Sequence, residues 1–472
     1  MMGRLLPAIA GLGFALAVAA QPEESLSLGT VLDRSARHAP KILEARQAVR
    51  ASEARRLGAE GNFDRTFDAS GFARTSGFYS GKYIGTRLSQ PLQNNGGEIY
   101  GGYRISNNDD FPIYEDEYIT LSGGEAEVGA KLALLRDREF DRRRYSLLEA
   151  DLAIEMAELD LLLQSIGIQH GAVRAYWRWV AAGLRLTIYQ DLLKIAEDRV
   201  TALSLRLNEG DVAQIDIVEN AQRILFRRSL AINARRDLDN AAITLSLYNR
   251  DEVGEPAIPD PLLLPETLPI TTDDMGRDID REIALALERQ AELALIDRKL
   301  ELATSKRRLG ENELLPEVDL GVKVARDFGS GSPTRDQTDL IFGLEVSVPL
   351  ERRKAKSEIA LADIETERLS LQRRDLEDRI RAEVTQLANI IDASRVNSTF
   401  ADLEVDQAQR LESAEWIRFE EGASNFFLLN LREESTADAR LRAVGAALAY
   451  QLAVADYLAI TADAEALGVI VP

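Results

Sequence analysis

The hydrophobic positions in two long stretches of the chain recur at the spacing of a helix face. Residues 352–420 contain neither glycine nor proline, and apolar side chains follow one another there at intervals of seven, four and three: Leu369, Leu376, Ile380, Val384, Leu387 and Ile391. The stretch 142–207 has the same spacing at Val173, Trp177, Val180, Leu184, Ile188, Leu192 and Ile195. Such spacing is typical of a packed or coiled helix. We therefore predict two very long helices, each spanning about 100 Å at a rise of 1.5 Å per residue.

Each predicted long helix ends at an isolated glycine, Gly210 in the first half and Gly422 in the second. Glycine at this position suits a left-handed cap or a tight turn. A returning helix of about 36 residues follows each glycine, and a helix of about 30 residues precedes each strand region, at 28–58 and 278–310. Because one helix of each kind, placed end to end, matches one long helix, we expect a single elongated wall of helices.

Alternating apolar and polar positions predict a small number of strands. The alternation is regular at Val128–Leu134, Val318–Val324 and Leu340–Val348, and less regular in a fourth segment near 67–78. Strands of about 9 to 11 residues with one apolar face can cross a bilayer as part of a barrel. For any single strand, a half-buried sheet over a soluble core is the alternative. Four strands cannot close a barrel alone, so the barrel interpretation needs other copies of the chain.

The two halves of the chain resemble each other. Arg55–Gly58 recurs as Arg307–Gly310, 252 residues later, whereas Val128–Leu135 lines up with Phe342–Pro349, 214 residues later. The difference gives the first half about 38 extra residues, between about residues 61 and 125. We predict these boundaries: a signal peptide at 1–20, a first repeat at 21–250, a proline-rich linker at 251–277, a second repeat at 278–462 and a C-terminal tail at 463–472.

The first 20 residues have the pattern of a cleavable secretory signal. Arg4 precedes an uncharged apolar run at 5–18, and small residues follow at 18–20. An uncleaved membrane anchor is the alternative, although the run is shorter than the roughly 18 to 20 residues that a spanning helix needs. No later stretch reaches that length either. We therefore expect an exported protein without a transmembrane helix.

Composition excludes several classes of function. Lys and Arg number 57 against 78 Asp and Glu, a formal charge of −21, which argues against a nucleic-acid partner. The chain contains no cysteine and only two histidines, which excludes thiolate chemistry and leaves little room for imidazole catalysis. It also contains no phosphate-binding glycine loop, HExxH or GxSxG motif. We predict no enzymatic activity, no cofactor and no metal site, and we interpret the charge as the wetted surface of long helices.

The order of these elements resembles the TolC-like outer-membrane efflux proteins. Ala175–Val180 is similar to the aromatic entry into the family's first long helix, and Val348–Leu350 to its strand-to-helix junction. Arg206–Gly210 with Asp216, and Arg418–Gly422, are similar to its two helical tips. No single motif is specific, but their order and doubled spacing are, and the resemblance covers about residues 27–461.

The resemblance implies a mainly α fold with a small β part, built from duplicated strand-strand/long-helix halves. It implies a homotrimer whose three chains form a twelve-stranded β-barrel in the cell outer membrane, in contact with lipid, and a long periplasmic α-helical tunnel. It further implies docking of the tunnel tips on a periplasmic adaptor protein and an inner-membrane transporter. The expected function is a passive exit duct of a tripartite efflux or type I secretion system. The alternative is a periplasmic coiled-coil adaptor or structural spacer without a pore.

The sequence departs from the family at the expected gate. The family often places acids six and nine residues after the second tip glycine, where this chain has Leu428 and Leu431. The equivalent positions of the first half are acidic, Asp216 and Glu219. Carboxylates brought together by symmetry would bind cations, whereas a ring of leucines would close by dewetting. Ordinary helix-start and packing roles are the alternatives. The candidate tip and gate residues are therefore Gly210, Asp216, Glu219, Gly422, Leu428 and Leu431.

The 38-residue excess is the second departure. It contains a segment rich in glycine and tyrosine at 94–105 and a short aromatic segment at 111–114. We interpret it as a long extracellular loop or small hairpin, because outer-membrane barrels place their long loops outside. A passive surface loop is favoured over ligand binding or pore plugging. The charge cluster at 136–144 that follows is interpreted as a network at the junction of strand and helix.

Overall fold

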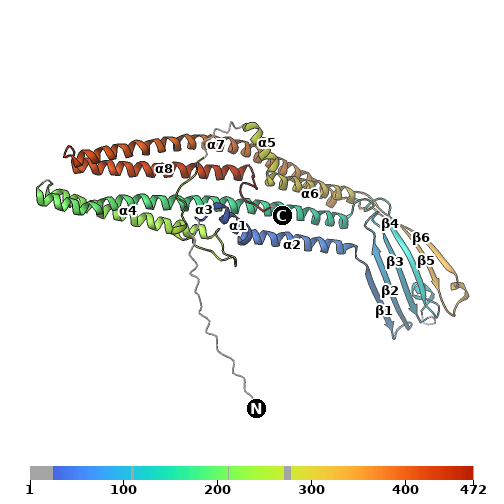
Figure 1. Ribbon diagram of the computed structural model, residues 1–472. Helices are drawn as coiled ribbons and strands as arrows, with labels where there is room; N and C mark the ends of the chain where they lie inside the picture. The colour runs from blue at the N-terminus through green and yellow to red at the C-terminus, as the bar shows by residue number, and fades with distance from the viewer. Residues whose placement is uncertain (1–24, 108–110, 211, 271–277, 471–472) are drawn as a thin grey trace, which may run out of the picture.

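The computed structural model describes residues 25–107, 111–210, 212–270 and 278–470, so the predicted signal peptide lies outside the described residues. Its long elements, in chain order, are α1 (Leu28–His38), α2 (Pro40–Glu60), β1 (Thr66–Arg74), β2 (Gly81–Pro91), β3 (Glu98–Ser106), β4 (Glu125–Ala133), α3 (Arg142–Glu209), α4 (Gln214–Ser246), α5 (Ile279–Arg289), α6 (Ala291–Glu313), β5 (Glu317–Asp327), β6 (Thr338–Ser347), α7 (Arg353–Glu420) and α8 (Phe426–Ile460). The predicted mainly α fold with a small β part is confirmed. Figure 1 shows the helices running along the molecule and the sheet at one end.

The helices of the two halves match in length, element by element. α3 and α7 both have 68 residues, α4 and α8 have 33 and 35, α2 and α6 have 21 and 23, and α1 and α5 have 11 each. At 1.5 Å per residue, α3 and α7 each span about 100 Å. α4 returns along α3 and α8 returns along α7, which makes two long helical hairpins lying side by side (Figure 1).

Short polar side chains determine where several helices begin. Asp141, before α3, accepts a hydrogen bond from the backbone N–H of Arg144 (2.8 Å), and Asn425, before α8, accepts one from Leu428 (2.9 Å). Each cap satisfies a backbone donor that has no partner within the helix. Pro40 begins α2. Because proline restricts the residue before it to extended conformations, α1 and α2 form two helices instead of one.

The main hydrophobic core lies halfway along α3. Trp179 and Val180 are fully buried there, against side chains from α1, α4, α8 and the C-terminal tail: Val31, Leu238, Leu245, Ala455 and Leu467. A second core surrounds Ile380 and Val384 of α7 and includes Ala286 of α5. All six predicted positions along α7, from Leu369 to Ile391, are buried. The apolar pattern of α7 therefore predicted its packed face correctly.

The described part of the proline-rich linker, 251–270, lies along the main core. The backbone N–H of Leu26 donates to the carbonyl of Leu263 (2.9 Å). Gly183 of α3 allows the linker to approach closely, because a Cβ at this position would lie 2.5 Å from Leu264. Linker residues 271–277 lie outside the described part of the chain.

Helix α8 corrects the expectation that no later stretch is apolar and long enough to span a membrane. Over the described residues it is the one helix that meets these criteria, with a mean hydropathy of 1.5 over 18 residues. Many of its apolar side chains are alanines, which make it uniformly apolar without a run of large side chains. It packs against both α7 and α3, and Ala447, Tyr450 and Ala453 are buried. Part of its apolar surface is therefore buried in the helical bundle.

The sheet contains six strands in the described residues, whereas the alternation pattern predicted four. All are antiparallel and neighbours in chain order, from β1 to β6. The two additional strands, β2 and β3, come from the insertion, where a long loop or a small hairpin was predicted, and they form a hairpin. Their alternation is hidden because glycine and tyrosine occupy positions such as Gly85, Tyr100 and Gly102, where charged residues would have marked the pattern. Two added antiparallel strands leave the direction in which β4 enters α3 unchanged. The second half makes the equivalent connection, from β6 into α7, with only two strands.

The six strands share one apolar face and one polar face. Cross-strand partners lie on the same face, and the pairs Phe67 with Leu88, Val128 with Val324 and Leu344 with Leu320 are apolar. The apolar face is exposed: Phe67, Val128 and Phe342 retain 68, 64 and 67% of their accessible surface. The side chains of the polar face are more buried, which indicates that it is the concave face.

Ion pairs join the sheet to the helices. Arg136, after β4, contacts Glu317 of β5 (3.4 Å), and Arg142 at the start of α3 contacts Glu313 of α6 (2.8 Å). The backbone N–H of Asp137 also donates to the side chain of Asn312 (2.9 Å). The charge cluster at 136–144 is thus a network at the junction of strand and helix, as the sequence indicated.

Candidate gate at the helical tips and polar face of the sheet

The two helical hairpins turn at the predicted glycines. Gly210 follows the last residue of α3 and has a φ of 81°, and Gly422 follows α7 with a φ of 71°. These left-handed conformations favour glycine. Beyond Gly422, the N–H of Ala423 donates to the carbonyl of Arg418 (2.7 Å) and closes the turn. Both tips lie at the end of the molecule opposite the sheet (Figure 1).

The two acidic candidates of the first tip have partners within their own helix. Asp216 Oδ2 accepts a hydrogen bond from the backbone N–H of Ala213 (2.9 Å), which caps the start of α4. Glu219 contacts Arg223, one turn later, at 3.7 Å. Asp216 therefore has a capping role and Glu219 an ion pair within its helix, and their role in a gate stays a prediction.

The apolar candidates of the second tip lie on a helix turn with one buried and one exposed side. Phe426 and Leu429 are buried in the hairpin, and Leu428 is half-buried. Leu431 and Phe427 retain 47 and 57% of their accessible surface. The exposed side of this turn is therefore apolar and free to face other copies of the chain.

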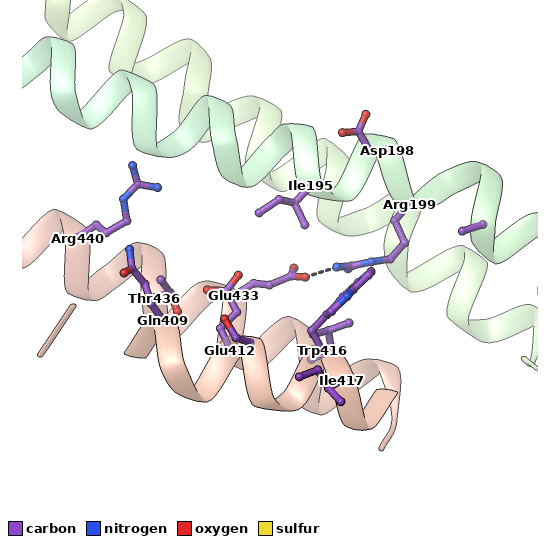
Figure 2. Close-up of a pocket in the computed structure, with 13 residues that line it drawn as sticks. Ile195, Asp198, Arg199, Gln409, Glu412, Trp416, Ile417, Glu433, Thr436 and Arg440 are labelled. Carbon is purple, nitrogen blue, oxygen red and sulfur yellow. Dashed lines mark hydrogen bonds and ion pairs between the residues drawn. The ribbon is translucent and has the colours of Figure 1, made fainter. Parts of the chain in front are cut away.

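A buried charge network near the tips was missed by the sequence analysis. Arg199 of α3, Arg227 of α4 and Glu433 of α8 retain only 5, 1 and 2% of their side-chain surface. Glu433 Oε2 lies 3.1 Å from Arg227 Nη2. The other carboxylate oxygen of Glu433 pairs with Arg199, as Figure 2 shows. Two guanidinium groups thus share one carboxylate, and they join both helices of the first hairpin to the second.

Neutral groups also accept hydrogen bonds from the two arginines of the charge network. Arg199 Nη1 donates to the side-chain oxygen of Asn430 (3.0 Å), and Arg227 Nη1 donates to the backbone carbonyl of Leu192 (2.9 Å). Burial lowers the pKa of the Arg227 guanidinium, although Glu433 acts in the opposite direction. A buried ion pair is stable only when such additional hydrogen bonds offset the cost of removing charges from water.

The sequence does contain a signal for this network. Leu192, Ala196, Arg199 and Leu203 are all buried at helical spacing along α3. An arginine in line with apolar positions indicates a buried charge, whereas most charges on a helix are solvated. Glu433 occupies the corresponding place in α8, between buried Leu429 and Thr436.

A cavity of 880 Å³ lies beside the charge network, between α3 and the α7/α8 hairpin. Its lining residues include Ile195, Arg199, Trp416, Glu433 and Arg440 (Figure 2). Burial raises the pKa of Glu412, which also lines the cavity. The cavity interrupts the packing between the two hairpins over this stretch.

The polar face of the sheet carries a second set of charges. Glu127 of β4 contacts Arg87 of β2 at 2.9 Å and Lys323 of β5 at 3.3 Å. Lys131 contacts Asp319 at 2.9 Å and also Glu345 of β6 at 3.5 Å. These pairs run across the strands and give the concave face both signs of charge. In the described residues, no group of three or more acidic, histidine or cysteine side chains is arranged to hold a metal ion.

Comparisons with known proteins identify the fold. No protein-family model matches the sequence, and no curated relative matches it. Solved structures do match. The outer-membrane channel OprN has 16% identity and a TM-score of 0.66, covering 97% of both chains. The Neisseria gonorrhoeae MtrE outer-membrane channel in its open state has 14% identity and a TM-score of 0.63, covering 97% of this chain and 98% of that one. The outer-membrane protein VceC of Vibrio cholerae has 13% identity and a TM-score of 0.64, covering 92% of this chain and 96% of that one. The chain therefore has the fold of these outer-membrane proteins over nearly its whole length.

Proposed function

We propose that this chain is an outer-membrane exit duct, a passive channel of a tripartite efflux or type I secretion system. The observation that carries the proposal is the sheet, which exposes apolar side chains across its strands on one face and pairs charges on the other. Lipid outside and water inside would suit both faces. The channels that share the fold support the same function.

Closing the barrel requires other copies of the chain. Every residue of β1 and β6, the outer strands of the sheet, is exposed. An open edge in lipid would leave backbone groups unpaired. Because the number of strands is even, β6 of one copy meets β1 of the next in the antiparallel orientation. In the homotrimer that the family resemblance implies, six strands from each copy make eighteen instead of twelve, a size at which barrels leave an aqueous channel.

The helical tips form the gate of this duct and its docking end. The partners found for Asp216 and Glu219 favour the apolar alternative, in which Leu428 and Leu431 of three copies close the tunnel by dewetting. Exposed apolar side chains near the first tip support docking of a periplasmic adaptor and an inner-membrane transporter: Leu205, Ile215 and Val218. The barrel then lies in the outer membrane and the helices extend through the periplasm.

A periplasmic adaptor or spacer without a pore is the competing function. It would account for the long helices, but it would leave the apolar face of six strands in water. A patch of this kind is typical of contact with a membrane or another protein. The exit duct is therefore the function that the geometry favours.

Recording from the purified oligomer in planar bilayers tests the pore. We expect discrete steps of ion conductance. Cysteines at Ser70 of β1 and Gly343 of β6, linked by a short bis-maleimide, should give covalent trimers, because the two edges of one sheet are separated by five strand spacings of about 4.8 Å. The chain has no cysteine of its own, so each single variant is the matched control and should stay unlinked. A monomer in the detergent-free soluble fraction without conductance would refute the proposal.

A further inference from the structure

The segment that leads into β4 lies on the polar face of the sheet. We call residues 111–124 the inner strap. Phe111, Thr120 and Leu121 are buried in it, at 7, 0 and 1% exposure. The strap is therefore packed against the sheet and is not the passive surface loop that the sequence analysis favoured.

Aromatic rings hold the first part of the inner strap. Tyr118 lies 5.1 Å from Phe72 of β1 and 5.2 Å from Tyr83 of β2, measured between ring centroids. Phe72 and Tyr83 are cross-strand partners and share the polar face with Asp68 and Arg87. These contacts place the strap on the side of the sheet that carries the ion pairs.

Phe111 lies unusually close to the strand beneath it. Its ring is 6.1 Å from Phe72, centroid to centroid, and a Cβ at Gly81 would lie 2.6 Å from it. The glycine that begins β2 thus leaves room for the ring. This complementarity indicates a defined position for the strap, since any larger residue at 81 would displace it.

Polar contacts hold the second part of the inner strap on the same face, toward the other edge of the sheet. The backbone N–H of Leu121 donates to Asp327 of β5 (3.0 Å), and Arg335, before β6, donates to the carbonyl of Ile119 (3.1 Å). Thr120 and Ser106 of β3 exchange two hydrogen bonds, both of 3.1 Å. The strap is thus held from both sides of the concave face.

We propose that the inner strap is a constriction inside the outer mouth of the barrel, which admits small solutes and excludes bulky ones. This inference rests on the proposed function, because the polar face is the lumen only if the apolar face contacts lipid. β1 leaves the helices at Thr66 and ends at Arg74, so Phe72 and the strap lie toward the end remote from the tunnel (Figure 1). Two added strands widen the barrel, and the strap from the same insertion narrows it again.

The space next to the inner strap provides a reporter position. A cavity of 350 Å³ on the polar face is lined by Ser70, Tyr83, Arg87 and Glu127, among others. Ser70 lies on the tunnel side of Phe72, and its neighbour Ala69 belongs to the apolar face. A reagent that enters from outside must therefore pass the strap to reach Ser70.

Labelling of intact cells from outside tests the constriction. Ser70→Cys is placed in the otherwise cysteine-free chain, with the native strap, with Phe111→Ala, or with 111–118 replaced by glycine and serine at equal length. We expect a small charged maleimide to label Ser70→Cys in all three. A maleimide linked to a long polyethylene glycol should label it only in the two altered straps, a loss of size exclusion. Recovery of trimers on gels shows which variants are folded.

The outcomes separate the constriction from the pore itself. Polymer labelling of Ser70→Cys beneath the native strap would overturn the constriction, and so would continued exclusion of the polymer in both altered straps. Ala69→Cys is the matched control and should resist the charged reagent. If the small reagent labels Ala69→Cys but not Ser70→Cys, the faces of the sheet are reversed and the proposed function fails as well.

Discussion

The two ends of the molecule distribute charge and apolar surface in opposite ways. Near the helical tips, Arg199 and Glu433 are buried between the helices as an ion pair. In the sheet, Val128 is exposed at 64% while the neighbouring Glu127 is paired on the concave face. In the proposed duct, this inversion means that the two ends face different solvents. A bundle in water buries its apolar side chains, whereas a barrel in lipid exposes them.

Of the substitutions that test this difference between the two ends, Glu433→Gln should destabilise the protein most. It leaves two buried guanidinium groups without a counter-charge, a change that costs about 3–5 kcal/mol for buried pairs. We expect the loss of stability to be confined to the tips, because the hydrophobic core around Trp179 does not include the charge network. Hydrogen exchange should show loss of protection at the start of α8, and channel conductance should rise as the tips separate.

The neighbouring glutamate is the control for Glu433. Glu434 pairs with Arg223 but is only partly buried, with 30% of its side-chain surface exposed. Exposed ion pairs contribute about 0–1 kcal/mol. Glu434→Gln should therefore leave exchange and conductance close to those of the native protein. Equal effects of the two variants would show that burial of the network does not hold the hairpins together.

Val128→Lys tests the opposite end and should have the second largest effect. A lysine facing lipid at the middle of a barrel costs about 2–4 kcal/mol. We expect loss of trimers from the outer membrane, measured by fractionation and gel migration, while Val128→Leu should insert normally. If Val128→Lys inserts as well as the native chain, the apolar face does not contact lipid.

The adjacent residue sharpens the same test. Glu127 lies on the other face, where its removal leaves Arg87 and Lys323 facing the lumen. Substitutions on the lumen side change selectivity more than insertion. Glu127→Gln should therefore insert and shift the reversal potential of the channel toward anions, so that two neighbouring residues give two different defects.

The sequence predicted features that depend on one regular pattern. The apolar spacing of α7 identified its buried face because no glycine or proline interrupts it. The tip glycines were found because an isolated glycine after a long helix has few other roles. The gate function of the six candidate residues stays a prediction.

The features that sequence analysis missed depend on contacts between distant segments. β2 and β3 were hidden because glycine and tyrosine occupy positions on the polar face, which weakens the alternation. The charge network was missed because burial of Glu433 depends on α3 and α4, more than 200 residues earlier. The strap was missed for the same reason, since Asp327 lies 206 residues from Leu121.

The smallest effect concerns the pH dependence of the tips. Burial raises the pKa of Glu412 above its ordinary value of 4.5. An acid whose folded pKa is raised destabilises the folded state above that pKa, and this cost disappears as the pH falls through the folded pKa toward 4.5. Glu412→Gln should therefore protect the cavity wall at neutral pH, with less hydrogen exchange in α7, and should match the native protein near pH 4.5. Because Glu412 is only half-buried, the gain should be smaller than the loss in Glu433→Gln. A difference between Glu412→Gln and the native protein that grows toward low pH would have the wrong sign and would show that the Glu412 carboxylate is stabilised in the folded state.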